Sequence, residues 1–274
     1  MRLRFLKMHG LGNDFVVIDD RKAKRRHVVT KATARRLCDR HFGVGADQIL
    51  HLVPAARGSR SDARLEIWNG DGTRAEMCGN GARAVGVYLS RYGARRTKTA
   101  RTFQIDTDAG PIGLELVGRD QVRVAMGFPR LGRKHGQEGE LIAVAGKQFR
   151  FHEVSMGNPH AVIFVKDLSR IDLAALGPLI EKHARFPERT NVEFVVVKSK
   201  SRIQVKVWER GAGATLACGT GACAAAVAAI DTGRARSPVS VELPGGKLKL
   251  EWKAGKAVYK TGPAAEVFWG EIEL

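Results

Sequence analysis

The feature that most constrains the fold is an internal repeat. The segment Leu65-Glu-Ile-Trp-Asn-Gly-Asp-Gly72 resembles Val205-Lys-Val-Trp-Glu-Arg-Gly-Ala212, and the two tryptophans lie 140 residues apart. At the same offset of 140 residues, Cys78-Gly-Asn-Gly-Ala-Arg-Ala84 matches Cys218-Gly-Thr-Gly-Ala-Cys-Ala224. Weaker matches precede these in the same order, residues 12–18 with 157–163 and 47–50 with 190–193. Because self-similarity at a nearly fixed offset marks a repeated structural unit, the chain is predicted to hold two copies of one fold related by a pseudo-twofold axis.

Strands dominate the predicted secondary structure. β-Branched or alternating runs bounded by Gly, Pro or Asp cover residues 14–18, 64–68, 103–107, 112–117, 121–126, 160–165, 192–198, 202–208 and 247–252. Amphipathic helical patterns occupy 30–41 and 172–184, each before an equivalent strand. The segment 222–230 is apolar on every face, which predicts a helix buried on all sides, and 82–89 is its counterpart with Arg83 as the exception.

These elements predict an α+β fold of two pseudo-symmetric domains. Each domain is expected to be a curled, mostly antiparallel sheet around a central helix, with the active site in the cleft between the domains. The polar turn at 118–120 suggests a boundary, and the tail is expected to return to the first sheet. The predicted N-terminal half is therefore 1–118 plus 262–274, and the C-terminal half is 119–261.

The chain is strongly basic: 46 Lys and Arg against 28 Asp and Glu give a formal charge of +18. Short basic runs lie at 21–26 and 95–98. A basic nucleic-acid-binding protein is therefore one alternative, but no recognition motif or aromatic interleaving accompanies the charge, so we favour a solvated surface. No apolar run is long enough to span a bilayer and no secretory signal is recognisable, so we expect a cytoplasmic protein without membrane contact.

The two Cys-Gly-x-Gly blocks carry the chemistry. A cysteine at the start of a helix lies near unpaired amide N–H groups and a partial positive charge, which favour a reactive thiolate. The same amides can hold a carboxylate. Two such blocks facing each other predict stereoinversion: the thiolate of Cys78 or Cys218 removes an α-proton from one face, and the other thiol returns a proton to the opposite face.

Several other interpretations of these residues are weaker. Both blocks match a loose dinucleotide fingerprint, but neither lies in a βαβ unit with a later acidic residue. Cys38 and Cys223 fall in predicted helices and are expected to be core residues. No C-x-x-C pair, P-loop or metal-spaced histidine cluster is present, so we expect neither a metal site nor a cofactor. In a cytosolic chain the four cysteines are expected to be reduced.

The chain resembles the diaminopimelate epimerase family along essentially its whole length. The motifs that carry the resemblance are Met8-His-Gly-Leu-Gly-Asn-Asp-Phe15, Gly43-Val-Gly-Ala-Asp-Gln48, Asn69-Gly-Asp-Gly72, Glu76-Met-Cys-Gly-Asn-Gly-Ala-Arg83, Gly157-Asn-Pro-His160, Asn191-Val-Glu-Phe194, Glu209-Arg-Gly-Ala-Gly213, Ala217-Cys-Gly-Thr-Gly-Ala-Cys223 and Thr261-Gly-Pro-Ala264. The resemblance implies a cofactor-independent isomerase that converts LL-2,6-diaminopimelate to its meso isomer in the biosynthesis of lysine and peptidoglycan precursors. It further implies a homodimer, which members of that family commonly form.

The resemblance also implies roles for individual residues. Cys78 and Cys218 are the implied acid and base, assisted by His160 and Glu209. The implied substrate-binding residues are Asn13, Gln48, Asn69, Gly79, Asn80, Asn158, Asn191, Glu209, Arg210, Gly219 and Thr220. Amide side chains supply both donors and acceptors, arginine a bidentate fork and glutamate an ammonium partner, which suits a diamino diacid.

Two positions depart from the family pattern. Ala214 stands where many members have Glu, and Phe268 stands where some have a tyrosine near the dimer contact. The nearest alternative function is another two-cysteine racemase or epimerase, such as one acting on proline or hydroxyproline. That family typically has His after the first Cys-Gly, whereas this chain has Asn80.

Overall fold

The computed structural model describes residues 2–23, 27–93 and 101–273, so the basic runs at 21–26 and 95–98 lie partly and wholly outside the described residues. The chain divides into two compact units, Met1–Val124 with Gly262–Leu274, and Ala125–Thr261. The expected boundary after residue 118 is therefore six residues too early. The reason is that β8 (Gln121–Ala125) continues the sheet of the first unit, where Val124 pairs with Leu114.

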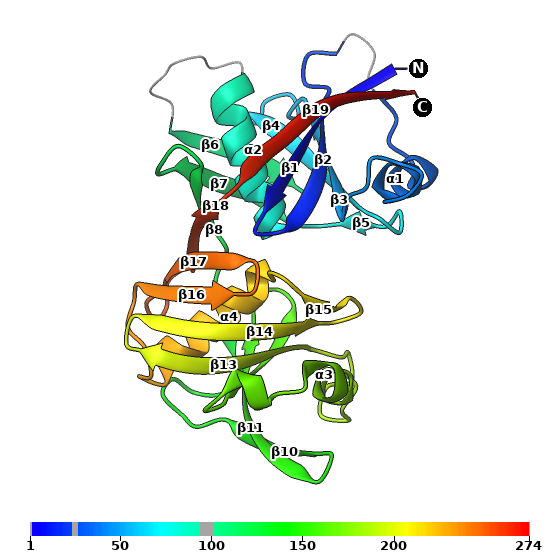
Figure 1. Cartoon of the computed structure of the whole chain (residues 1–274). Coiled ribbons are helices and arrows are strands. Elements are labelled where there is room, and N and C mark those ends of the chain that lie inside the picture. The colour runs from blue at the N-terminus through cyan, green and yellow to red at the C-terminus, as the bar shows by residue number, and fades with distance from the viewer. Residues whose placement is uncertain (1, 24–26, 94–100, 274) are drawn as a thin grey trace. The chain divides into compact units, whose positions relative to one another are not determined.

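The first unit is built on strands that surround a buried helix (Figure 1). Its strands are β1 (Arg2–Gly10), β2 (Asn13–Asp19), β3 (Gln48–Val53), β4 (Ala63–Asn69), β5 (Arg74–Ala75), β6 (Thr102–Thr107), β7 (Gly110–Leu116), β8 and β19 (Ala265–Glu273), and its helices are α1 (Lys31–Cys38) and α2 (Gly79–Tyr92). The tail strand β19 pairs antiparallel with β1, from Arg2 opposite Glu273 to His9 opposite Ala265. This pairing confirms the expected return of the tail to the first sheet.

The second unit has the same kind of construction. Its strands are β9 (Arg130–Leu131), β10 (Glu140–Val144), β11 (Lys147–Ser155), β12 (Pro159–Phe164), β13 (Asn191–Ser199), β14 (Arg202–Glu209), β15 (Gly213–Thr215), β16 (Val239–Leu243), β17 (Gly246–Glu251) and β18 (Tyr259–Pro263), with α3 (Leu173–Glu181), α4 (Gly219–Asp231) and a 3-10 turn at Leu168–Arg170. Overall, the described residues form a mixed α/β structure of mostly strands with four α-helices.

The order and direction of the strands repeat between the units. In the first unit β2 pairs parallel with β3, β3 antiparallel with β4, and β4 parallel with β6. In the second unit β12 pairs parallel with β13, β13 antiparallel with β14, and β14 parallel with β16. Antiparallel pairs occur in both units as well, for example β6 with β7 and β16 with β17. Thus each copy of the sequence repeat forms one unit, and the two units share this order of strand pairing.

Helix α4 forms the centre of the second unit. It packs against β11, β12, β13, β14, β16 and β17, and its residues 221–229 are all buried. Most of these residues are alanine, because strands that approach a helix from several sides leave little room for larger side chains. In an interior this tightly packed, an added side chain costs roughly 1–3 kcal/mol. The all-apolar pattern of the sequence therefore predicted the burial of this helix correctly.

The helix of the first unit differs by one buried charge. Residues 79–89 of α2 are buried, including Arg83, which is fully enclosed. The Arg83 Nη1 donates to Asn80 Oδ1 at 2.8 Å and its Nε donates to the carbonyl of Pro263 at 3.1 Å. A buried guanidinium needs such acceptors, since an unpaired buried charge is costly.

Two predicted helices end earlier than expected. Helix α1 begins after Thr30, whose hydroxyl accepts from the Thr33 amide at 3.1 Å, but it stops at Cys38 and not at 41. The Asp39 carboxylate accepts from the amides of His41 and Phe42, which replaces the next helical turn with a side-chain turn. Helix α3 likewise stops at Glu181 and not at 184. Among the described residues, no helix is both long and apolar enough to cross a membrane.

Candidate active site

Two helix N-termini hold the predicted catalytic thiols. Cys78 is the N-cap residue of α2, and its Sγ accepts a hydrogen bond from the Gly81 amide at 3.3 Å. Cys218 is the N-cap residue of α4, and its Sγ accepts from the Gly221 amide, also at 3.3 Å. Each sulfur thus takes the place that a serine or aspartate oxygen usually occupies at a helix start. The free amides and the positive end of the helix favour a negative charge on both sulfurs.

In the first unit, asparagine side chains surround the half-buried Cys78. The Cys78 thiol donates to Asn13 Oδ1 at 3.7 Å, and Asn80 Nδ2 donates to the same oxygen at 3.3 Å. The Asn13 Nδ2 in turn donates to Asp47 Oδ2 at 2.8 Å. Asp47 therefore fixes the Asn13 amide with its carbonyl oxygen toward the thiol. Gly79, the first residue of α2, places its backbone at the same helix start.

Gln48 and Asn69 lie opposite each other on β3 and β4. Gln48 Nε2 donates to Asn69 Oδ1 at 2.8 Å, and Asn69 Nδ2 donates to the Thr73 hydroxyl at 3.0 Å. Both residues stand at strand ends, Gln48 beside Phe15 of the parallel strand β2. The structure therefore brings these two predicted binding residues together at the sheet edge where Asn13 begins β2.

In the second unit, four predicted site residues form a chain that ends at Cys218. The Cys218 Sγ lies 3.5 Å from Thr220 Oγ1, and Asn158 Nδ2 donates to that hydroxyl oxygen at 3.3 Å. Asn158 Oδ1 lies 3.1 Å from His160 Nε2. The other ring nitrogen, His160 Nδ1, lies 2.7 Å from Glu193 Oε1. Gly219 begins α4 directly after the thiol.

Burial and nearby charge act on the groups of this chain. Burial, followed by Glu209 and by Glu193 in its ionised form, raises the pKa of the Cys218 thiol well above its ordinary value, against the hydrogen bonds from Thr220 and Gly221. Burial also raises the pKa of Glu193, although its contact with the His160 ring opposes this. Without a cation nearby, the Cys218 thiol is therefore protonated at neutral pH.

The remaining predicted residues lie where β14 ends and the adjacent strand β13 begins. Asn191 accepts from the Arg210 amide at 2.9 Å and donates to the carbonyl of Pro159 at 2.9 Å, so both ends of its amide serve the protein itself. Glu209 Oε1 accepts from the Thr215 hydroxyl at 2.5 Å. The guanidinium of Arg210 is exposed and donates from Nη1 to the carbonyl of Glu188 at 3.1 Å.

The structure adds residues that the sequence did not assign. Glu193 lies completely buried beneath the first turn of α4, and Asp47 orients Asn13. Glu193 had a detectable signal: it is a charged residue in the otherwise apolar run Val192-Glu-Phe-Val-Val-Val197. A charge at such a position indicates a buried partner. Asp47 had no comparable signal, because acidic residues are common in turns.

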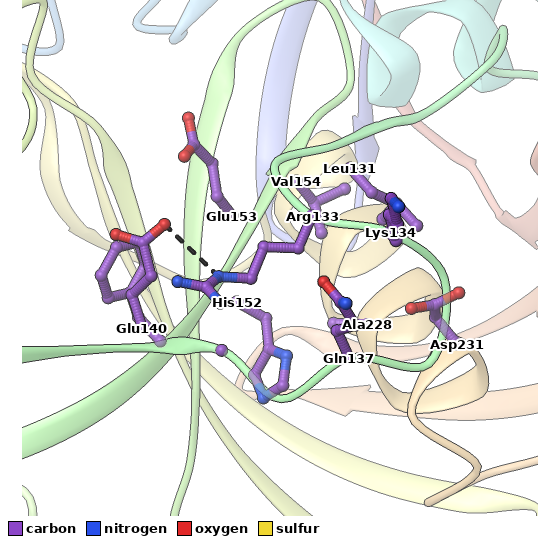
Figure 2. A pocket seen from close by; sticks show the side chains of 12 residues that line it. Leu131, Arg133, Lys134, Gln137, Glu140, His152, Glu153, Val154, Ala228 and Asp231 are labelled. Atoms are coloured by element: carbon purple, nitrogen blue, oxygen red, sulfur yellow. Dashed lines mark ion pairs between the residues drawn. The ribbon is translucent and has the colours of Figure 1, made fainter.

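A small pocket lies elsewhere in the second unit, near the C-terminal end of α4 (Figure 2). Its volume is about 20 Å³, roughly the space of one water molecule. Its lining includes Arg133, Gln137, Glu140, His152, Glu153 and Asp231, and Arg133 pairs with Glu140 at 3.5 Å. The candidate site residues, all of which the structure describes, take no part in this lining. Within 2–23, 27–93 and 101–273, no group of three or more His, Cys, Asp or Glu could hold a metal ion.

Comparison with known proteins gives consistent matches. The family model described as diaminopimelate epimerase matches residues 5–132 and 153–267. A diaminopimelate epimerase of Carboxydothermus hydrogenoformans is 47% identical over 282 residues, covering 99% of this chain and 100% of that protein. Diaminopimelate epimerase 1 of a Nostoc species is 44% identical over 284 residues, covering 99% and 100% respectively. A hydroxyproline epimerase from Agrobacterium vitis has a similar structure, with a TM-score of 0.73 at 16% identity over 99% of this chain and 92% of that one, which concerns the fold alone.

Proposed function

Because the chain belongs to the diaminopimelate epimerase family, it is an isomerase of lysine biosynthesis, and we propose that Cys78 and Cys218 are its acid and base. The substrate that this implies is LL-2,6-diaminopimelate, and the product is the meso isomer. The observation that carries the assignment is the matched N-cap position of the two thiols, each with a 3.3 Å hydrogen bond from an amide of its own helix.

The proposed reaction needs one thiolate and one thiol. The thiolate takes the α-proton, which breaks one C–H bond and forms an S–H bond, while the electron pair moves toward the substrate carboxylate. The second thiol then donates its proton to the opposite face of the carbon and becomes the thiolate. General acid–base groups supply roughly 10²–10⁴-fold each. The helix amides at residues 79–80 and 219–220 stabilise the added negative charge on the carboxylate.

The charge distribution around Cys218 suits an ammonium-bearing substrate. Burial and the negative charge of Glu209 hold the pKa of this thiol high while the site is empty. A substrate ammonium group near Glu209 neutralises part of that negative charge and so lowers the pKa of the thiol. We infer that the base is generated mainly when substrate is bound. In the empty site the sulfur then stays a thiol, which is less reactive than a thiolate.

The remaining roles follow the same proposal. Asn13, Gln48, Asn69, Gly79 and Asn80 bind substrate from the first unit. The binding residues of the second unit are Asn158, Asn191, Glu209, Arg210, Gly219 and Thr220, with Arg210 on the unreacting carboxylate and His160 assisting the proton transfers. The two units are the proposed epimerase halves, with the substrate in a cleft between them.

We further propose a homodimer. Strand β19 supports it by exposing two large aromatic side chains, Phe268 with 48% of its surface accessible and Trp269 with 40%. Aromatic side chains are enriched where protein surfaces bind each other.

Proton exchange in deuterated water tests the activity directly. LL-Diaminopimelate incubated with the protein, without added cofactor, should convert to the meso isomer and gain deuterium at one α-carbon, as followed by NMR. Trans-4-hydroxy-L-proline is the comparison substrate, because the similar fold of the Agrobacterium vitis epimerase raises that alternative. Exchange with hydroxyproline and none with diaminopimelate would refute the proposed substrate.

A further inference from the structure

A buried carboxyl group is linked to the Cys218 sulfur through three intervening side chains. The successive pairs are Glu193 Oε1 with His160 Nδ1 at 2.7 Å, His160 Nε2 with Asn158 Oδ1 at 3.1 Å, Asn158 Nδ2 with Thr220 Oγ1 at 3.3 Å, and Thr220 Oγ1 with Cys218 Sγ at 3.5 Å. All five residues belong to the second unit. Glu193 and His160 have no accessible side-chain surface.

The amide of Asn158 gives this chain a direction. Its Oδ1 can only accept, so His160 Nε2 must carry a hydrogen and donate it. Its Nδ2 donates to Thr220 Oγ1, which leaves the single hydrogen of that hydroxyl available for the Cys218 sulfur. Together with the Gly221 amide at 3.3 Å, the sulfur then receives two donors, and donors favour the thiolate.

The state of His160 depends on what Glu193 presents to its other nitrogen. An ionised Glu193 could accept from a neutral ring through Nδ1–H, which would leave Nε2 without a hydrogen and reverse the chain. Two observations argue for the neutral carboxylic acid. Glu193 is wholly buried and its Oε2 has no hydrogen-bond partner among the described residues, an arrangement that penalises an ionised carboxylate strongly. Its Oε1 also lies only 2.6 Å from where a Cβ on Gly221 would stand, so the group is closely enclosed by the start of α4.

We propose that Glu193 is a positioning residue that donates its proton to His160 Nδ1 and thereby aligns His160, Asn158 and Thr220 as successive donors toward the Cys218 sulfur. This inference rests on the proposed role of Cys218 as a catalytic base. A neutral Glu193 favours that role in two ways. It orients the donors toward the sulfur, and it places no negative charge beside the sulfur.

In the first unit, the side-chain hydrogen bond at the thiol has the opposite direction. Asn13 presents a carbonyl oxygen to Cys78, so this sulfur donates its hydrogen, and the amide is held by the acceptor Asp47. Cys78 is therefore poised as the acid and Cys218 as the base. A two-base isomerase needs one thiol and one thiolate at the start of each turnover, and these two side-chain networks supply that asymmetry.

Two substitutions of Glu193 separate its possible roles. Glutamine keeps a donor for His160 Nδ1, so Glu193→Gln should retain kcat within about threefold, whereas Glu193→Leu should lower kcat by about ten- to a hundredfold with little change in KM. If the residue acted by its negative charge, both variants would lose activity equally. If it only filled space, Glu193→Leu would keep its kcat per folded molecule.

The sign of the shift in thiol reactivity gives a second test that needs no substrate. The rate of iodoacetamide labelling of Cys218 is measured across pH by peptide mapping. The midpoint of its pH dependence should move to higher pH in Glu193→Leu and in Thr220→Val, but not in Thr220→Ser. Movement to lower pH in Glu193→Leu would overturn the proposal, since loss of a nearby negative charge has that effect. The control is Asp20→Asn, which alters another buried acid–histidine pair, 2.9 Å from His51 Nε2. It should leave Cys218 labelling unchanged.

Direct observation of His160 keeps the proposal testable even if Glu193→Leu does not fold. In ¹⁵N-labelled wild-type protein, the ring should carry hydrogen on Nε2 and not on Nδ1 at the pH of maximal activity. A neutral ring with hydrogen on Nδ1 alone would contradict the proposal. Because the NMR and labelling readouts use no diaminopimelate, failure of the proposed substrate and failure of the positioning role remain distinguishable.

Discussion

Cys78 and Cys218 occupy the same structural position in two separate units: each is the N-cap of a largely buried helix, and each sulfur lies 3.3 Å from the amide nitrogen three residues later. The equivalence extends to the preceding hairpins, where Trp68 pairs with Arg74 and Trp208 with Ala214. The surroundings of the sulfurs differ, however. Cys78 faces an acceptor from Asn13, whereas Cys218 faces the hydroxyl of Thr220. A symmetric frame thus carries two chemically different thiols.

Alanine at Gly221 should damage the second thiol site. A Cβ there would lie 2.6 Å from Glu193 Oε1 and 3.2 Å from Cys218 Sγ, so either the carboxyl or the sulfur must move. We expect Gly221→Ala to lower kcat at least about tenfold and to destabilise the protein by about 1–3 kcal/mol. Activity assays and urea unfolding measure both effects.

Two other glycines serve as comparisons for that variant. A Cβ at Gly81 would meet the flexible Leu50 side chain at 2.8 Å and lie in ordinary contact with Cys78 Cβ at 3.5 Å, and among the described residues one at Gly113 would meet nothing within 4 Å. Gly81→Ala should therefore lose less activity than Gly221→Ala, and Gly113→Ala should behave as wild type. Equal activity of Gly221→Ala and Gly113→Ala would show that the close packing of Gly221 against Glu193 and Cys218 is not needed for catalysis.

Arg210→Ala should raise the KM for diaminopimelate without unfolding the protein. Its guanidinium is exposed in the structure and bonded only to a carbonyl among the contacts described, that of Glu188. If a substrate carboxylate desolvates this charge, truncation costs about 2–5 kcal/mol of binding, whereas a surface arginine contributes only about 0–1 kcal/mol. Arg202→Ala, at the other end of β14, is the control. Steady-state kinetics that are the same for both variants would mean that the distal carboxylate is bound elsewhere.

The free energy of unfolding of the protein should fall in acid as Asp14 becomes protonated. Burial opposes its ionisation, but hydrogen bonds from Arg40 and Lys7 outweigh this and lower its pKa to about 2. Because the folded pKa lies below the unfolded value, the stabilisation is present above about pH 4 and is lost as pH falls toward 2. The difference in unfolding free energy between wild type and Asp14→Asn should therefore shrink by about 2 kcal/mol between pH 6 and pH 2. A difference that does not vary with pH would exclude this linkage.

Much of the fold could be predicted because its strongest signals are local. Alternation located β4 and β14, and the uniformly apolar residues 222–230 indicated a buried helix. Both central helices begin three residues earlier than expected, at Gly79 and Gly219. Glycine disfavours helices, and only the capping thiols reveal where these begin. Strand β11 was missed because polar and charged residues interrupt its pattern, Lys147-Gln-Phe-Arg-Phe-His-Glu-Val-Ser155.

The sequence proposed the residues of the candidate site but not the connections between them. Spacing alone identified the two thiols, and the family motifs supplied Asn13, Asn158 and Thr220. The hydrogen-bond direction around each sulfur depends on tertiary contacts, such as Asp47 with Asn13 and Glu193 with His160. These pairs are 34 and 33 residues apart in the chain, so no local pattern could reveal them.

The most direct test of the two-thiol account is α-proton exchange by single cysteine variants. Wild type, Cys78→Ser and Cys218→Ser should be incubated separately with LL- and meso-diaminopimelate in deuterated water, with circular dichroism confirming that each variant folds. A serine hydroxyl is a far weaker acid than a thiol, so each variant should lose inversion in both directions by at least about a thousandfold. A single variant that retained near-wild-type inversion in both directions would contradict the two-thiol mechanism.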